Sequence, residues 1–307
     1  MKFAAPSRSR PRNSPSSATL PPPPLAGEGW GGGKLPTATD TGLATTASEA
    51  PVLTIAGVGK RFASGLQALG GVDLTVRRGE FVSLLGPSGC GKSTLLRIVA
   101  GLSQPSTGNC ALHLDTAPGQ RVASGRVGFV FQDATLMPWS TVLNNVLLPF
   151  RIARHLGAAE RERAAAALRS VSLAGFENAY PHQLSGGMRM RVSIARALVT
   201  EPDLLLLDEP FAALDEITRL ALNDDLLRLW ETRRPTVLFV THSVFESVYL
   251  STRIAVMAAR PGRIVADLPV DLPHPRERAI RTAPDYVAAC EQVSAALGAA
   301  MPQGATR

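Results

Sequence analysis

The sequence lacks the features that would cross-link a small fold or anchor it in a bilayer. It has only three cysteines in 307 residues, Cys90, Cys110 and Cys290. They form no C-x-x-C pair and their number is odd, which argues against a disulfide framework or zinc site and favours a reducing compartment. No apolar run approaches the roughly 20 residues that a helix needs to cross a membrane. We therefore expect a chain that does not span a bilayer by itself.

Strong charge of one sign is also missing. The net charge is +7, of which +2 falls in residues 1–50 and the rest is spread thinly over the chain. Such a distribution does not indicate a nucleic-acid-binding face, although a mildly basic surface suits anionic lipid or a membrane partner equally well. We expect no nucleic-acid partner.

Residues 1–50 are rich in proline and glycine, with PPPP at 21–24 and GEGWGGG at 27–33. Such a segment cannot bury enough apolar surface to offset its ordering entropy. Its first 27 residues, rich in Arg and Ser without an acid, also resemble a transit peptide. We favour a disordered tail or an over-extended start, with order from about Pro51.

From there on, short apolar runs alternate with helical patterns. Between 103 and 132, turn residues separate short apolar runs, which predicts antiparallel strands. The alternation elsewhere predicts an α/β fold with a mainly parallel sheet, an antiparallel β subdomain and a helical insertion. Strands are predicted at 72–80, 81–85, 127–132, 204–208, 236–241 and 253–259, and helices at 92–102, over most of 141–199, at 215–231 and from Ser243.

GPSGCGKS at 86–93 matches the phosphate-binding pattern G-x-x-x-x-G-K-[ST]. It follows a predicted strand and opens a predicted helix, which is the context of a P-loop and argues against a chance glycine turn. Backbone N–H groups would wrap the phosphates, Lys92 would reach the β- and γ-phosphates, and Ser93 would bind Mg²⁺. A P-loop ATPase core is thus expected. The predicted phosphate-binding residues are Gly86, Pro87, Ser88, Gly89, Cys90, Gly91, Lys92, Ser93 and Thr94.

Two carboxylates follow the apolar run LLLL at 204–207. Ligands bind at the carboxyl ends of such parallel strands, and adjacent acids are costly unless a cation is near. Asp208 would hold Mg²⁺ and Glu209 would orient or deprotonate the attacking water. A strand-ending Asp that caps a helix is the alternative.

Gln132 and His242 also follow predicted strands, so both should lie with Asp208 along one sheet edge. Gln132 would contact Mg²⁺ or the water, and His242 the γ-phosphate, although each alone is more often a satisfied loop residue. Phe62 would stack on adenine, but for Phe62 taken alone core packing is the better interpretation. Cys90, beside a helix N-terminus, is predicted to have a lowered thiol pKa.

A second candidate phosphate-binding segment lies about a hundred residues after the P-loop. HQLSGGM at 182–188 opens a predicted helix, Met188–Val199. Exposed N–H groups at a helix start attract anions, and glycines let a phosphate come close.

Together these motifs resemble the ATPase subunits of ATP-binding cassette (ABC) transporters, over about Val52 to Leu268, with LSGGM the most specific element. Met188 stands where Gln is commoner, and Phe62 where Tyr is. The resemblance implies an adenine-stacking Phe62, a Q-loop Gln132, a signature with Ser185, Gly186 and Gly187, an acidic pair Asp208 and Glu209, a D-loop ending at Asp215 and a switch His242.

A finer resemblance, to the nitrate/sulfonate/taurine importer branch, rests on DATLMPWSTVLNNVLLP at 133–149, the signature helix, and THSVFESVYL followed by ARPGRI. It implies ATP and Mg²⁺, a head-to-tail dimer in which Ser185 and Gly187 act on the partner's ATP, transmembrane permeases and, indirectly, a periplasmic solute-binding protein. The expected location is peripheral, on the cytoplasmic face of the inner membrane. The expected domains are a tail at 1–50, an ABC ATPase domain at 51–268 with a helical subdomain at 133–199, and an extension at 269–307.

A soluble ABC ATPase is the competing function. Chromosome-type members carry a long coiled coil, and translation-factor members carry two cassettes, whereas this sequence shows one P-loop and one signature. P-loop kinases and GTPases lack LSGG, and the base-recognition pattern N-K-x-D is absent here. Trp139, close after Gln132, is either an anchor for a cytoplasmic permease helix or a packed residue of the helical subdomain.

Overall fold

The computed structural model describes residues 51–114 and 126–301. The tail predicted at 1–50 lies outside these ranges, as do 115–125 and 302–307. The described residues all belong to one compact unit, Thr45–Arg307.

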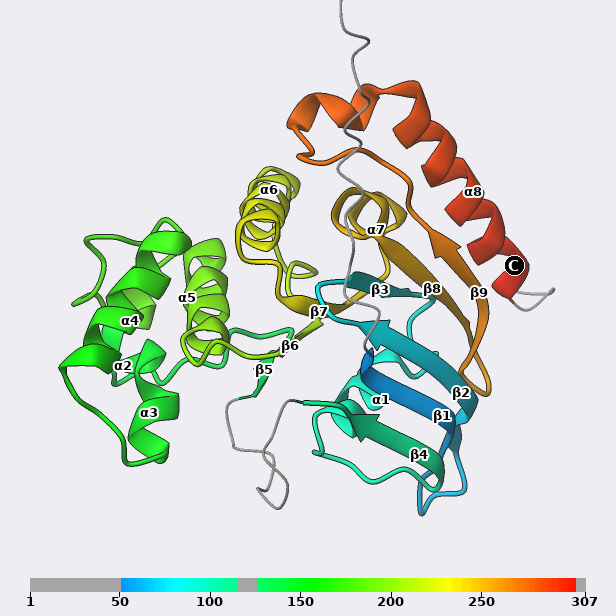
Figure 1. The fold of residues 1–307 in the computed structure, drawn as a ribbon, viewed down its shortest axis with the longest axis horizontal. Coiled ribbons are helices and arrows are strands. Elements are labelled where there is room, and N and C mark those ends of the chain that lie inside the picture. The colour runs from blue at the N-terminus through cyan, green and yellow to red at the C-terminus, as the bar shows by residue number, and fades with distance from the viewer. Residues whose placement is uncertain (1–50, 115–125, 302–307) are drawn as a thin grey trace, which may run out of the picture. The chain divides into compact units, whose positions relative to one another are not determined.

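Two sheets form the centre of this unit (Figure 1). A three-stranded antiparallel sheet has the order β2-β1-β4, and a six-stranded sheet has the order β5-β6-β7-β3-β8-β9. In the larger sheet, only β9 runs antiparallel to its neighbour. The strands are β1 (Pro51–Arg61), β2 (Gln67–Arg77), β3 (Phe81–Leu85), β4 (Thr107–Leu112), β5 (Val127–Val130), β6 (Leu204–Asp208), β7 (Thr236–Thr241), β8 (Arg253–Ala258) and β9 (Arg263–Pro269).

Both faces of the larger sheet are covered, which explains its apolar strands. Along β6, Leu204 and Leu206 join one apolar core with the small sheet and α1, while Leu205 and Leu207 join a second core with the helices. Strand side chains alternate between faces, so a run of four leucines fills both cores.

The helices divide into four groups. α1 (Lys92–Val99) follows β3, and α2 (Val142–Val146), α3 (Leu148–Ile152), α4 (Ala158–Ser170), the short η1 (Pro181–Gln183) and α5 (Gly186–Leu198) form the helical insertion, green in Figure 1. α6 (Glu216–Arg233) and α7 (Val244–Leu250) follow β6 and β7, and η2 (Arg278–Thr282) and α8 (Pro284–Ala300) end the described chain. None of the helices described in 51–114 and 126–301 is both long and apolar enough to cross a membrane.

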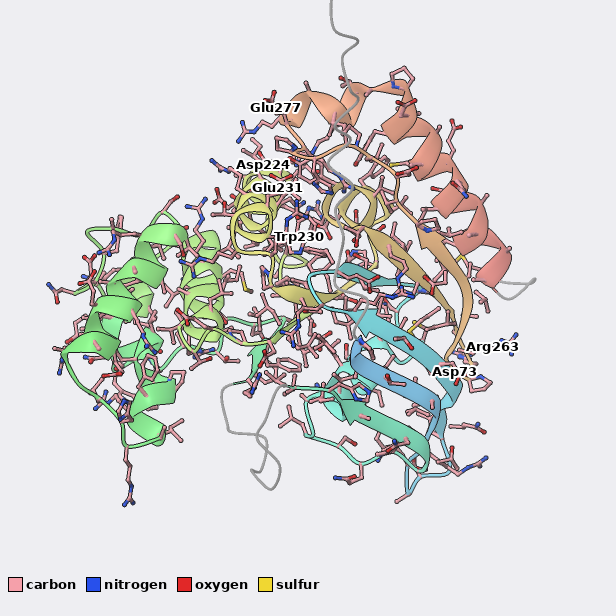
Figure 2. All side chains as sticks on the ribbon, in the orientation of Figure 1. Asp73, Asp224, Trp230, Glu231, Arg263 and Glu277 are labelled. Carbon is pink, nitrogen blue, oxygen red and sulfur yellow. The ribbon has the colours of Figure 1, made fainter. Side chains whose placement is uncertain are left out.

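The segment after residue 268 is packed on the ATPase core. Tyr286, Cys290 and Val293 of α8 belong to the same apolar core as the helix-facing side of the large sheet. Figure 2 labels Asp224 and Glu231 on α6, beside the chain that leads to α8. Glu231 accepts hydrogen bonds from the backbone N–H of Arg276 and pairs with His274 Nδ1, both at 2.9 Å.

Two expectations about strands need correction. The stretch 103–132 does not form antiparallel strands throughout: β4 pairs antiparallel with β1, but β5 pairs parallel with β6. β5 also ends at Val130, so Gln132 lies two residues beyond the strand rather than at its end. Alternating turns and short apolar runs do not identify a strand's partner, and here the partner of Val127 is Leu204, far along the chain.

Candidate active site

The P-loop joins β3 to α1. Gly91 caps α1 at its N-terminus with a left-handed φ of 99°. A Cβ there would lie 2.7 Å from Leu69 Cδ2 and 2.9 Å from the Ala68 carbonyl oxygen, so both the backbone and the packing require glycine. The loop thus turns tightly against β2, and its N–H groups lie at a helix start, where anions are stabilised.

Lys92 is folded into this loop. Its side chain is buried, and Nζ donates to the carbonyl oxygens of Gly86 at 2.8 Å and Pro87 at 3.2 Å. Nζ also lies 3.5 Å from Glu209 Oε1. The loop therefore presents one positioned cation beside the acidic pair.

The predicted low pKa of the Cys90 thiol is wrong. Cys90 is fully buried against the P-loop, and burial raises its pKa more than the nearby Lys92 charge lowers it. A Cβ on Gly86 would lie 2.9 Å from Cys90 Sγ, which shows that this thiol is turned into the loop's own packing. Its place at a helix N-terminus does not compensate for the loss of solvation.

Cys90 should consequently resist a maleimide in the folded protein. We expect it to react at least ~10-fold more slowly than the partly buried Cys110, because burial raises the pKa of both thiols but closes only Cys90 to the reagent. Mass-spectrometric labelling in buffer, with labelling in guanidinium as the control, measures both rates. Labelling of Cys90 as fast as that of Cys110 would contradict its burial.

The acidic pair ends β6. Ser93 Oγ donates to Asp208 Oδ1 at 2.7 Å, which links the P-loop helix to the strand. Burial raises the pKa of the Asp208 carboxyl, against the opposing effect of the Ser93 hydrogen bond. A buried carboxylate and a hydroxyl together are hard oxygen donors, so these two residues suit Mg²⁺ shared with phosphate oxygens. The described residues contain no group of three or more His, Cys, Asp and Glu side chains that would hold a metal without such help.

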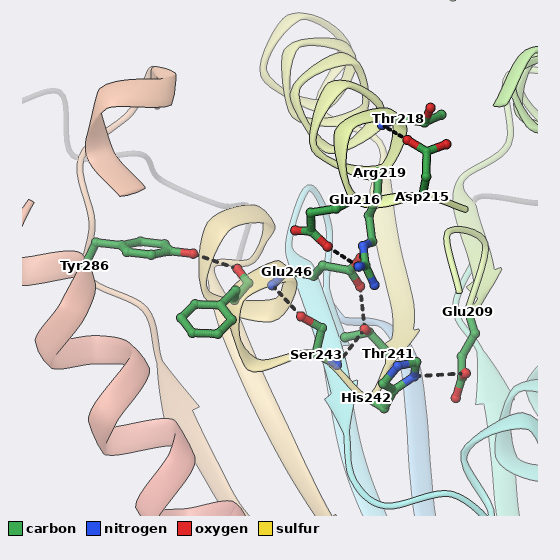
Figure 3. Close-up of polar contacts among 11 residues, drawn as sticks. Glu209, Asp215, Glu216, Thr218, Arg219, Thr241, His242, Ser243, Glu246 and Tyr286 are labelled. Carbon is green, nitrogen blue, oxygen red and sulfur yellow. Dashed lines mark hydrogen bonds and ion pairs between the residues drawn. The ribbon is translucent and has the colours of Figure 1, made fainter. Parts of the chain in front are cut away.

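Glu209 leaves the strand in a left-handed conformation, with φ of 44°. This conformation is uncommon outside glycine and marks sites where surrounding structure imposes it. Its Oε2 lies 3.2 Å from His242 Nδ1, at the end of β7 (Figure 3). Glu209 therefore lies between the Lys92 ammonium and the His242 imidazole.

A cavity of about 560 Å³ opens beside these groups. Phe62, which is 42% exposed, is on its wall rather than in the core, so the core-packing alternative is wrong for this residue. Gln132 and Glu209 also line it. The P-loop contributes Ser88, Gly89, Gly91, Lys92, Ser93 and Thr94.

The cavity wall also contains residues that the motifs do not indicate. Arg260 lines it from the β8–β9 turn, Leu66 from the β1–β2 turn and Gln67 from the start of β2. The β8–β9 turn meets the start of β2 through two backbone hydrogen bonds: Gly70 N donates to Gly262 O, and Gly262 N donates to Ala68 O, both at 2.9 Å. No sequence pattern marks such a contact between distant segments.

The signature lies elsewhere on the same chain. Ser185 caps α5, its Oγ accepting from Met188 N at 3.2 Å, so the helix begins at Gly186 rather than Met188. A Cβ on Gly187 would lie 2.6 Å from Thr218 Cγ2, so a larger residue there would displace Thr218 where α5 approaches α6. Gly186 lines a separate small cavity. Of the residues that the structure describes, none of the signature lines the P-loop cavity.

Asp215 caps α6 beside the signature helix. Its carboxylate accepts from Thr218 N at 2.9 Å, and this hydrogen bond lowers its pKa. The D-loop acid thus has a structural role in this conformation, on an exposed helix end.

Comparison with known proteins identifies relatives of the same architecture. The family model described as ABC transporter matches residues 69–212. An uncharacterized ABC transporter ATP-binding protein of Methanocaldococcus jannaschii is 49% identical over 216 residues, 69% of this chain and 79% of that protein. The aliphatic sulfonates import ATP-binding protein SsuB 2 of Streptomyces avermitilis is 46% identical over 255 residues, 83% of this chain and 94% of that protein.

A solved structure described as a dimeric bacterial ABC transporter cassette matches with a TM-score of 0.62 and 34% identity. The match covers 72% of this chain and 99% of that chain. The same cassette in a dimeric post-hydrolysis state holds ADP and Pi, with the same TM-score and identity.

Proposed function

This chain belongs to the ABC transporter ATP-binding proteins, and on that premise we propose that it powers import of nitrate, a sulfonate, taurine or a related small solute. It is an ATP hydrolase of the sulfonate/nitrate importer branch, which acts as a dimer together with permease subunits. We place it at the cytoplasmic face of the inner membrane, with a periplasmic solute-binding protein delivering the substrate.

The observation that carries the proposed mechanism is that Phe62, the P-loop, Gln132 and Glu209 line the same cavity. Adenine would stack on Phe62, and the phosphates would lie along Ser88–Thr94. Mg²⁺, held by Ser93, Asp208 and Gln132, would offset charge on the phosphate oxygens. Glu209 accepts a proton from the attacking water, and His242 and Lys92 stabilise charge at the γ-phosphate.

The signature completes the site from a second copy. The signature residues Ser185, Gly186 and Gly187 form a helix N-terminus. They do not line the P-loop cavity of their own chain. A head-to-tail dimer would bring each signature, with Asp215, onto the partner's γ-phosphate. Each chain then needs two phosphate-binding segments, the P-loop and the signature, because it contributes to two ATP sites.

Trp139 suits a contact with the permease. It is 77% exposed, which excludes the alternative of packing inside the helical subdomain. Buried Asn145 fixes the turn beneath it, accepting from Met137 N at 2.7 Å and donating to the carbonyl oxygens of Ser140 and Thr141. An exposed Trp on a hydrogen-bonded turn, close after the Gln132 loop, is a suitable hot spot for a cytoplasmic permease helix.

Trp139→Ala should uncouple transport from hydrolysis. In vesicles containing the permease, ATP-driven uptake should fall ~10-fold, while the basal ATPase rate of the isolated chain stays near wild type. Leu102→Ala, which removes another exposed apolar side chain, is the matched control. Equal loss of uptake and basal ATPase, with a lower Tm, would contradict the anchor.

A soluble ABC ATPase without a permease is the alternative that a transport experiment excludes. It predicts that deletion of this chain leaves uptake of every candidate solute unchanged. Reading the neighbouring genes for a solute-binding protein, and measuring its binding of nitrate, taurine and an alkanesulfonate, would identify the substrate within the branch.

A further inference from the structure

A chain of polar contacts runs behind the site, from the loop of His242 to the helix that starts at the D-loop (Figure 3). Its centre is Glu246, on the first turn of α7, which is 8% exposed. Glu246 Oε2 accepts a hydrogen bond from Thr241 Oγ1 at 2.6 Å. Thr241 is the residue immediately before His242.

The same threonine holds the next residue of the loop. Thr241 Oγ1 accepts from Ser243 N at 3.0 Å, and Ser243 Oγ accepts from Glu246 N at 3.3 Å as the cap of α7. His242 thus lies between two residues of this network: Thr241, which bonds to Glu246, and Ser243, which bonds to both Thr241 and Glu246. The backbone that carries the imidazole is fixed by one buried carboxylate.

Glu246 is also joined to α6. Its Oε1 lies 3.9 Å from Arg219 Nε, and Arg219 pairs on its other side with the exposed Glu216. Arg219 N donates to the carbonyl oxygen of Asp215 at 2.9 Å, in the first turn that Asp215 caps. The carboxylate therefore ties the His242 loop to the start of the D-loop helix.

Neither Glu246 nor Arg219 lines the P-loop cavity. Both line a separate cavity of about 460 Å³ between α6, α7 and the α8 segment. Burial raises the pKa of the Glu246 carboxyl, although Thr241, Arg219 and His242 each oppose the shift.

We infer that Glu246 is a positioning residue for His242, which it holds against Glu209 and links through Arg219 to the D-loop helix. The inference rests on the role proposed above for His242. Movement of the Asp215 end of α6 on dimer closure would reach His242 through this ion pair, without any contact between Glu246 and ATP.

Glu246→Gln preserves shape but removes the charge that faces Arg219. We expect kcat for ATP to fall ~10-fold, with the Kd for nucleotide essentially unchanged, since only the geometry of His242 is disturbed. Glu216→Gln removes charge from the other, exposed side of the same Arg219 and should leave kcat near wild type. Wild-type kcat in Glu246→Gln, or an equal fall in both variants, would overturn the inference.

A double-mutant cycle tests whether the effect passes through His242. His242→Ala should lower kcat, and adding Glu246→Gln to it should lower kcat no further. A further fall of the same size would overturn the positioning role alone, whereas a full rate in His242→Ala would overturn the assignment of His242 and this inference with it.

Thr241 gives an independent test if Glu246→Gln folds poorly. Thr241→Ser keeps the hydroxyl that bonds Glu246 and should keep kcat, whereas Thr241→Val loses the hydroxyl and should lose kcat as Glu246→Gln does. Equal loss in both threonine variants would overturn the inference.

Discussion

Glu209→Gln should abolish ATP turnover while leaving ATP bound. The substitution keeps the shape of a side chain placed between Lys92 and His242 but removes its ability to take a proton. We expect kcat to fall ~10²-fold or more, as for loss of a general base. ATP should then stay trapped between two chains, which size-exclusion chromatography with labelled ATP would detect as a nucleotide-bound dimer.

Lys92→Ala is the control for this experiment, because it should weaken binding of the phosphates themselves. Retention of more than about a tenth of the wild-type rate by Glu209→Gln would exclude Glu209 as the general base. Loss of ATP binding in Glu209→Gln would instead assign it a structural role, beside the strained backbone at φ of 44°.

Much of this site could be predicted from sequence because its signals are local. A buried strand followed by GPSGCGKS defines the P-loop backbone, and apolar strands that end at Asp208 and before His242 place both residues on one edge of a parallel sheet. The structure brings Ser93 to Asp208 and His242 to Glu209 as that reasoning requires.

The remainder depends on packing between distant segments, which no local pattern encodes. Arg260 reaches the cavity only because the β8–β9 turn bonds to β2. The P-loop pattern sets the path of the backbone but not the burial of Cys90, so its thiol pKa was predicted in the wrong direction. In the sequence, Glu246 is an ordinary acid in the first turn of a helix, and only its burial and its contacts with Thr241 and Arg219 distinguish it.

The arrangement across the dimer predicts complementation between two inactive variants. Lys92→Ala damages the P-loop, and Ser185→Arg places a cation on an exposed helix cap where the partner's phosphate must approach. In a head-to-tail dimer of one copy of each, both lesions fall on the same site. The other site then combines an intact P-loop with an intact signature.

Ser185→Arg also removes the hydrogen bond that caps α5, which is worth ~1 kcal/mol. Ser185→Ala removes the same cap without adding a cation, so it separates loss of helix stability from obstruction of the phosphate. We expect Ser185→Arg to retain almost no ATP and Ser185→Ala clearly more, because only Ser185→Arg obstructs the phosphate. Both should be measured in the Glu209→Gln background, where trapping replaces turnover.

The most direct measurement is the amount of ATP occluded by purified mixed dimers of Lys92→Ala and Ser185→Arg, each also carrying Glu209→Gln. A dimer with two shared sites should occlude about one ATP per mixed dimer, while each variant alone occludes almost none. If mixed dimers form but hold no more ATP than the average of their parents, each chain uses its own P-loop and signature, and the shared-site account is wrong.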